Sequence, residues 1–173
     1  GLGSESEFSH DNEIAEPGYY QVKLDSFDVL AEMTCTKRVA LYKFTFPESS
    51  SPRMLLDLNQ GSDPSKGVVE QRSDRALQGN VYCVRRKKHN QYYQIQFSTP
   101  FASCTESEKG AVISWPEGAE KTIYVKLAIS FVSTENAQLN LDAEMPGWDF
   151  DAVRAEARSE WNNELAKIEL VDA

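Results

Sequence analysis

The pattern of apolar and polar residues changes once along the chain, near residue 131. Before that point apolar residues alternate with polar ones in short runs, and this period of two is typical of β-strands with one buried face. After that point apolar residues recur at steps of three and four, which is the period of an amphipathic helix. The chain is therefore predicted to contain a β-domain over residues 1–131, followed by helices over residues 132–173.

The first three strands are expected at 19–24, 29–35 and 39–46, joined by short connections as an antiparallel meander. Residues 1–16 are polar and acidic and predict an irregular lead-in. Glu32, Thr34 and Thr36 alternate with the apolar residues of the second strand and are expected on its outer side. The residues expected to point inward are Tyr20, Val22, Leu24, Val29, Ala31, Met33, Cys35, Ala40, Tyr42, Phe44 and Phe46.

Further strands are expected near 54–58, 68–70, 76–86, 93–97, 111–115 and 123–131. The run 54–58 is apolar almost throughout, as expected of a strand covered on both faces. Roughly ten short strands at close intervals favour a mainly β fold, a sandwich of two antiparallel sheets. A closed barrel would give a similar pattern and stays open as the alternative. The basic run 85–89 is expected to be a solvated hairpin tip.

Two helices are expected after the strands. Ser133 is a suitable N-cap for a short helix that ends before Pro146, and Asp149 is one for a longer helix that reaches about Ile168. A short isolated helix is marginal in water, so the longer helix needs a surface to cover. That surface is either its own sheet or a domain outside these 173 residues. The apolar row of this helix is Phe150, Val153, Ala157, Trp161, Leu165 and Ile168.

Composition excludes several classes of protein. The 173 residues carry a formal net charge of −9, whereas a protein that tracks nucleic-acid phosphates is normally basic. No apolar run is long enough to span a bilayer. Three cysteines without C-x-x-C spacing argue against a disulfide framework or a zinc site, although one disulfide with one remaining thiol stays possible. Cys35 and Cys83 lie in apolar strands and are expected to be buried; Cys104 is the third.

Few residues suggest chemistry. The two histidines lie far apart in sequence, and we find no metalloprotease, phosphate-binding, nucleophile-elbow or calcium-loop motif. The loop 8–13 gathers polar side chains, and His10, Asn12 and Glu13 are candidates for a groove that hydrogen-bonds a polyol. The alternative is that they satisfy neighbouring backbone groups. Trp161 is expected to pack in the core, whereas Trp148 could either pack or stack on a sugar.

Several blocks of the chain resemble glycoside hydrolase family 92, the α-mannosidases. Phe8-Ser9-His10 with residues 13–20 resembles the opening of a strand in the N-terminal domain of that family. Residues 29–39 resemble its A-E-x-T-x-T-x-R-V hairpin, and residues 42–47 its next strand. The most distinctive block is 144–154, which contains Pro-Gly-Trp-Asp-Phe and resembles the run that joins the two domains of the family; residues 129–133, 136–137 and 161–162 belong to the same run.

The resemblance implies a supersandwich of the galactose-mutarotase type, followed by a linker helix to an (α/α)6 catalytic domain. Members of the family are exo-acting, calcium-dependent α-mannosidases, often specific for α-1,2 links, that invert the anomeric centre and are usually exported to the periplasm or cell surface. Their active site lies between the two domains, and the catalytic and calcium-binding residues come mainly from the barrel. The family's sandwich also begins earlier than this chain. We therefore expect no catalytic residue, metal or cofactor here, no mannoside hydrolysis by this chain alone, and mannose-containing glycans as the substrate of the parent enzyme.

Overall fold

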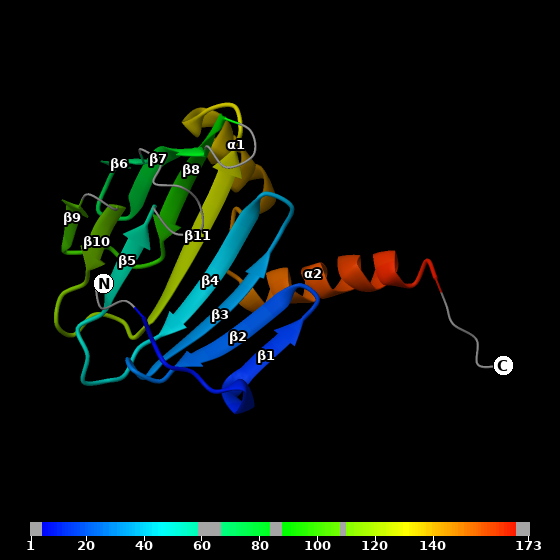
Figure 1. Cartoon of the computed structure of the whole chain (residues 1–173), viewed down its shortest axis with the longest axis horizontal. Helices are drawn as coiled ribbons and strands as arrows, with labels where there is room; N and C mark the ends of the chain where they lie inside the picture. The colour runs from blue at the N-terminus through cyan, green and yellow to red at the C-terminus, as the bar shows by residue number, and fades with distance from the viewer. Residues whose placement is uncertain (1–4, 59–66, 84–87, 108–109, 169–173) are drawn as a thin grey trace.

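The computed structural model describes residues 5–58, 67–83, 88–107 and 110–168 (Figure 1). The chain runs through strands first and helices last, as the sequence pattern predicts. The elements are η1 (His10–Asn12), β1 (Glu13–Glu16), β2 (Tyr19–Leu24), β3 (Val29–Cys35), β4 (Val39–Thr45), β5 (Arg53–Asp57), β6 (Gly67–Gln71), β7 (Ala76–Cys83), β8 (His89–Phe97), β9 (Ser103–Ser107), β10 (Gly110–Ser114), β11 (Thr122–Ser130), α1 (Thr134–Glu144) and α2 (Phe150–Leu165).

Two antiparallel sheets of unequal width form the β-domain. Within the described residues, the large sheet has eight strands in the order β1-β2-β3-β4-β11-β8-β7-β6, and the small sheet has three in the order β5-β10-β9. The small sheet lies over the β11-to-β6 half of the large sheet (Figure 1). The fold is therefore a β-sandwich rather than a closed barrel.

The main hydrophobic core lies between the two sheets. Ile113 and Trp115 from the β10 region pack against Phe97 of β8 and Phe101, and the Trp115 and Phe97 rings meet edge to face at 5.4 Å. Offset and edge-to-face aromatic pairs of this kind add to the stability that apolar burial gives. Trp115 also donates its indole N–H to the carbonyl of Thr99 at 3.0 Å, so that its polar atom is satisfied inside the core.

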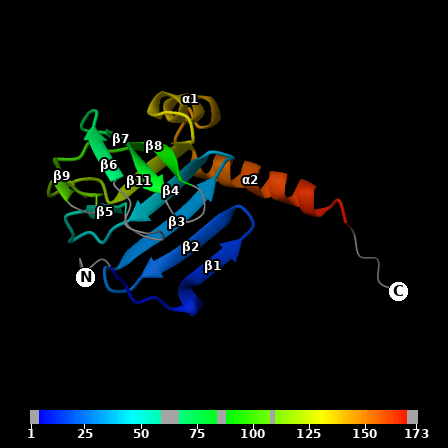
Figure 2. The same ribbon diagram turned by 45° about the horizontal axis from the view of Figure 1, so that its top comes forward.

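Both helices cover the opposite face of the large sheet. A second core forms there, in which Leu141 and Met145 at the end of α1 and Phe150 at the start of α2 pack on Leu41 and Val39 of β4. The predicted caps are confirmed: Ser133 accepts from the amide of Asn136 at 3.2 Å, and Asp149 accepts from the amide of Ala152 at 3.0 Å. Figure 2 shows α2 starting behind the sheet and projecting beyond it.

Two expectations about the first strands are wrong. Residues 13–16 are not irregular, because they form β1, which pairs with β2 from Glu13↔Val22 to Glu16↔Tyr19. Glu32 and Thr34 are not on an outer surface, because α2 covers the face to which they point, and both are buried. A sequence pattern marks only an apolar row as buried, so it does not reveal a polar row that a helix from a distant part of the chain covers.

The expected burial of Cys35 and Cys83 is also wrong. Cys35 is exposed and Cys83 is only half-buried; with Cys104 they are the free thiols of the chain. Met33, on the same row as Cys35, is 37% exposed. The three-stranded sheet does not extend over this part of β3, so residues with an inward pattern face solvent. The predicted hairpin tip at 85–89 falls mostly outside the described residues.

Candidate functional site

The connection between α1 and α2 is fixed by a buried lysine. Lys126 of β11 is 2% exposed. Its Nζ donates to the carbonyl of Met145 at 2.7 Å and lies 4.1 Å from the centre of the Trp148 ring. Burial lowers the pKa of Lys126, although Asp142 opposes this by favouring the charged form. A buried ammonium needs such partners, because removing a charge from water is costly. Lys126 therefore attaches the large sheet to the α1–α2 connection, which sets the direction of α2.

A carboxylate on the same connection holds the β3–β4 hairpin. Glu144, the last residue of α1, accepts hydrogen bonds from the hydroxyl of Thr36 at 2.6 Å, from the amide of Arg38 at 3.0 Å and from its guanidinium. Partial burial acts to raise the pKa of Glu144, but the hydrogen bonds from Thr36 and Arg38 outweigh it and lower the pKa. Three charge-assisted hydrogen bonds to one carboxylate make this contact specific in direction.

The first turns of α2 rest on a polar cluster of β2, β3 and β4. Tyr19 donates its hydroxyl to Glu32 at 2.9 Å, and Lys43 pairs with the other oxygen of Glu32 at 2.8 Å. Burial, and then the hydrogen bond to Glu32, raise the pKa of Tyr19 to about 12. Arg154 of α2 lies over the Tyr19 ring at 3.4 Å, and Phe150 meets the same ring edge to face at 6.3 Å. This cluster fixes the rotation of α2 about its axis.

The tightest approach of α2 to the sheet is at the β1–β2 turn. Gly18 has a φ of +80°, and a Cβ placed there would lie 3.0 Å from the Cβ of Ala157 and 3.1 Å from its backbone. Glycine alone satisfies both the left-handed backbone and the close contact. Arg154 adds an ion pair to Glu16 at 3.6 Å on the same turn. The helix is thus held along its first two turns.

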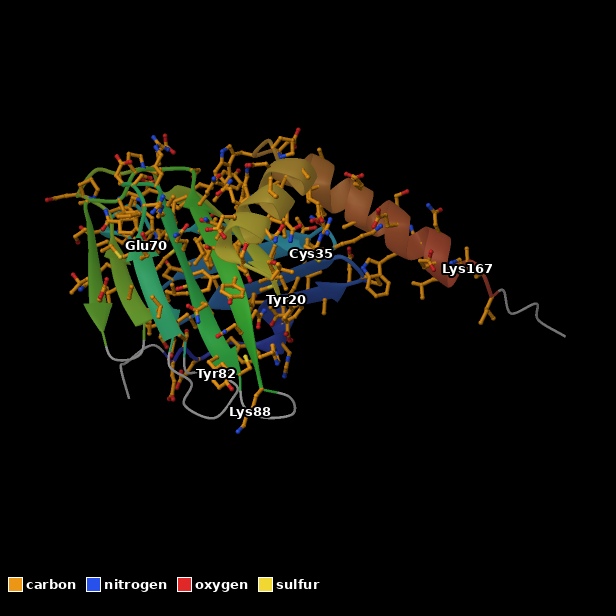
Figure 3. All side chains as sticks on the ribbon, turned by 90° about the horizontal axis from the view of Figure 1, so that it is seen from above. Tyr20, Cys35, Glu70, Tyr82, Lys88 and Lys167 are labelled. Atoms are coloured by element: carbon orange, nitrogen blue, oxygen red, sulfur yellow. The ribbon has the colours of Figure 1, made fainter. Side chains whose placement is uncertain are left out.

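Beyond Ala157 the apolar row of α2 leaves the sheet. Trp161 is 49% exposed, and Leu165 and Ile168 are exposed as well, so the expectation that Trp161 packs in the core is wrong for this chain. In Figure 3 Lys167 marks the end of this segment, well away from the strands. The row from Phe150 to Ile168 keeps one helical face throughout, and only its first half has a partner in this structure.

The three binding candidates from the sequence do not converge on one site. His10 Nδ1 lies 2.5 Å from one carboxylate oxygen of Glu13, and the hydroxyl of Tyr20 donates to the other at 2.5 Å. The hydrogen bond from Tyr20, and then that from His10, lower the pKa of Glu13. Asn12 instead lines an open hollow of about 410 Å³ on the face of the sheet that α2 covers. Ile14 also lines this hollow, and Glu13 points to the other face because consecutive strand residues alternate between faces. The other residues that line the hollow are Asp11, Gln21, Lys23, Asp25 and Leu30.

The described residues do not fit a calcium site. Among them, no group of three or more histidine, cysteine, aspartate or glutamate side chains could hold a metal ion. Calcium takes six to eight oxygen ligands, and the exposed Asp11 and Asp25 beside the hollow fall short of that number. We derive no calcium-dependent step for this chain. In the same described part, no helix is both long and apolar enough to cross a membrane.

Comparison with known families explains the joint, by which we mean the α1–α2 connection (residues 145–149) together with Lys126 and Glu144, which hold it. The profile of the glycosyl hydrolase family 92 N-terminal domain matches residues 2–142. The chain belongs to glycoside hydrolase family 92. The profile of the family 92 catalytic domain matches residues 136–173, so that the end of α1, Trp148 and all of α2 fall in the part assigned to the second domain. Lys126 and Glu144 therefore connect the two family 92 segments.

Solved structures and one curated protein agree with this assignment. An α-mannosidase of family 92 from Bacteroides thetaiotaomicron superposes with a TM-score of 0.87 at 28% identity, over 97% of this chain and 26% of its own. A family 92 inverting mannosidase of the same organism gives 0.81 at 22% identity, over 96% and 24%. An uncharacterized secreted glycosidase of Arthroderma benhamiae is 25% identical over 92% of this chain and 26% of its own. The chain spans about a quarter of the length of these relatives.

Sequence reasoning missed the residues that build the joint. Lys126 alternates with apolar residues in β11 and is indistinguishable in sequence from a solvated strand lysine. Glu144 precedes the Pro-Gly pair and also has the pattern of a helix surface residue. The only available signal was Trp148 beside that pair, since a large aromatic residue in a short connection usually packs on something.

Proposed function

We propose that this chain is the non-catalytic N-terminal domain of a calcium-dependent, inverting exo-α-mannosidase that acts on α-1,2-linked mannose in glycans. Membership of glycoside hydrolase family 92 supports a role as part of a glycosidase. Family 92 neighbours named as α-mannosidases support α-mannosides as the substrate class. The domain forms one wall of the active-site cleft, and an (α/α)6 catalytic domain of the same polypeptide supplies the acid, the base and the calcium ligands. A fungal relative named as secreted supports an exported protein.

One observation carries this proposal. The apolar row of α2 continues past the sheet to Trp161, Leu165 and Ile168, and the catalytic-domain profile covers the same residues. An exposed apolar helical stripe is typical of an interface surface. Because Lys126 and Glu144 fix the connection before it, the helix presents this stripe to the second domain in one orientation.

The experiment compares this chain with the full-length polypeptide on α-1,2-linked mannobiose. We expect the full-length protein to release mannose with inversion, which proton NMR of the anomeric signal detects. We also expect this activity to be lost when calcium is chelated. We expect no release by residues 1–173 alone, because inversion needs an acid and a base about 6.5–9.5 Å apart around a bound sugar. Mannose release by the 173-residue chain would overturn the proposal.

A carbohydrate-binding module is the second candidate function, and the hollow beside Asn12 favours it. Its amide and charged side chains could hydrogen-bond sugar hydroxyls, although no aromatic residue lines it among the described residues. Calorimetric titration of mannose and mannobiose into this chain separates the two. Saturable binding that Asn12→Ala abolishes would support a carbohydrate-binding module. If the titration gives no binding heat, the result supports the role as one wall of the active-site cleft instead.

A further inference from the structure

The outer face of β7 and β8, two strands that lie within the described residues, carries no charged side chain. Leu77, Ile95 and Phe97 point from these strands into the sandwich core, so the alternate residues point outward. A solvated surface is normally about 25–35% lysine, arginine, glutamate and aspartate, and 26% of this chain is charged. The outward residues here are instead amides, tyrosines and one alanine: Ala76, Gln78, Asn80, Tyr82, Asn90, Tyr92, Gln94 and Gln96.

Hydrogen bonds between side chains hold part of this face in place. Gln94 is 6% exposed where α1 packs on β8, and it donates to Gln78 at 2.8 Å. Gln78 in turn donates to Glu70 of β6 at 2.7 Å. Arg72 pairs with the other oxygen of Glu70 at 2.9 Å, so the charge at the border of the face is compensated. This buried anchor preorganises the amides, which lowers the entropy cost of binding a ligand.

The accessible part of the face combines amides with aromatic rings. Tyr82 is 37% exposed, and Tyr92, Asn80 and Asn90 are partly exposed. Asn80 donates to Asn90 at 3.2 Å, which uses only one donor and one acceptor of the two amides. A tyrosine ring adds a flat apolar surface with a polar tip. We call Gln78, Asn80, Tyr82, Asn90, Tyr92 and Gln96 the amide face.

The amide face fits a neutral ligand that carries many hydroxyl groups. A sugar hydroxyl both donates and accepts hydrogen bonds, as an amide does, whereas a carboxylate only accepts and an ammonium only donates. A charged ligand needs opposite charges, and the outer positions of these two described strands supply none. Successive outward residues of a strand are about 6.8 Å apart, so the face from Tyr82 to Ala76 extends over about 20 Å, the length of a short oligosaccharide.

We propose that the amide face is a glycan-binding surface that takes an extended stretch of a neutral oligosaccharide. The choice of a mannose oligosaccharide as this ligand rests on the proposed function. The surface differs from the hollow beside Asn12, because the hollow lies at the β1 end of the large sheet and β7 lies near the other end (Figure 1). The surface gives the domain a hold on a glycan through side chains of β7 and β8 alone.

The experiment titrates α-1,2-linked mannotetraose into this isotope-labelled chain and follows it by heteronuclear NMR, in which the side-chain amides of asparagine and glutamine are observed directly. We expect saturable shifts of the side-chain amide signals of Asn80 and Asn90. Tyr82→Ala should weaken binding about fivefold or more, whereas Tyr82→Trp should retain it, because the larger ring offers the same kind of surface. Asn90→Asp keeps the size of the side chain but removes its donors, so it should also weaken binding.

The matched control is Asn163→Ala, which removes an exposed amide from α2 and should leave the affinity unchanged. Cellotetraose is the second probe. Binding of cellotetraose alone would support the surface and count against mannose as the substrate class of the proposed function. Binding of neither sugar, or shifts centred on the hollow beside Asn12, would overturn the proposal. So would shifts of the amide face that depend on protein concentration without sugar, since a second copy would then occupy it.

Discussion

Lys126→Met tests whether the buried lysine holds the joint rather than stabilising the sheet. In the native protein the ammonium gains about 1.5–3 kcal/mol from its charged hydrogen bond and about 0.5–2 kcal/mol from the Trp148 ring. Against this stands a desolvation cost of several kcal/mol for a buried ion. Methionine fills nearly the same volume and buries a similar apolar length, so it avoids the desolvation cost but leaves the Met145 carbonyl without a donor, at about 1–3 kcal/mol. These terms nearly offset, so we expect the free energy of unfolding to change by about 1 kcal/mol or less.

The joint should respond differently from the sheet. Without Lys126 the carbonyl of Met145 loses its donor and Trp148 its cation, so the α1–α2 connection loses its polar attachment to β11 and α2 keeps only its apolar contacts there. We expect hydrogen exchange of the amides at 150–157 to become about tenfold faster, while exchange of β8 and β11 amides stays unchanged. Lys121→Met is the matched control, because Lys121 also donates to a carbonyl, that of Ser50 at 2.7 Å, but lies outside the joint.

The pH dependence gives an independent check on Lys126. Because burial lowers its pKa in the folded chain, the unfolded chain binds this proton more tightly between the folded pKa and the ordinary value of 10.5. The free energy of unfolding contributed by this group therefore rises with pH in that window. The difference between wild type and Lys126→Met, measured by denaturant titration, should show that rise. Unchanged exchange of α2, or a loss above about 4 kcal/mol, would refute the view that Lys126 acts mainly on the joint.

Three further predictions concern the same region. Gly18→Ala should lower the free energy of unfolding by about 2–4 kcal/mol, because of the positive φ and the contact with Ala157. Gly118 has the same φ of +80° but open space around it, so Gly118→Ala should lower the free energy by only about 1 kcal/mol. Denaturant titration measures both. Glu144→Gln should flatten the loss of stability on acidification, because the pKa of Glu144 is lowered in the folded chain and its contribution, present above pH 4.5, is lost as pH falls through the folded pKa. Trp161→Ala should change the stability of this chain by less than about 0.5 kcal/mol, and a larger loss in thermal melts would contradict its exposure.

Sequence periodicity predicted the strands of the large sheet well, because they have one clearly apolar row. Tyr93, Ile95 and Phe97 alternate in sequence and lie in the core. β1 was missed because Glu13–Glu16 is a short edge strand with no buried residue, and its two apolar residues, Ile14 and Ala15, are adjacent and do not alternate with polar ones. Its pairing is determined by the β1–β2 turn at Gly18, where the backbone conformation and the approach of α2 both require glycine.

The polar face of β3 shows a different limit. Glu32 and Thr34 have the pattern of solvated residues, yet they lie beneath α2. Their burial depends on Tyr19 and Lys43, which satisfy the Glu32 carboxylate, and on a helix that begins more than a hundred residues later. No local window of sequence contains those partners. In the loop 8–13, His10 and Glu13 contact each other, whereas Asn12 lines the hollow on the other side, so the three polar residues do not form one groove.

The two sets of residues whose exposure contradicts their pattern lie on opposite faces of the large sheet. Met33 and Cys35 alternate as buried strand residues but are exposed on the face of β3 opposite α2, while Trp161 and Leu165 continue the buried row of α2 but project past the sheet. Exposed apolar side chains in a periodic row are typical of interface surfaces. Because the two rows lie on opposite faces of the large sheet, the contacts that hold the first half of α2 do not act on Met33 and Cys35. The exposure of each row therefore needs its own explanation.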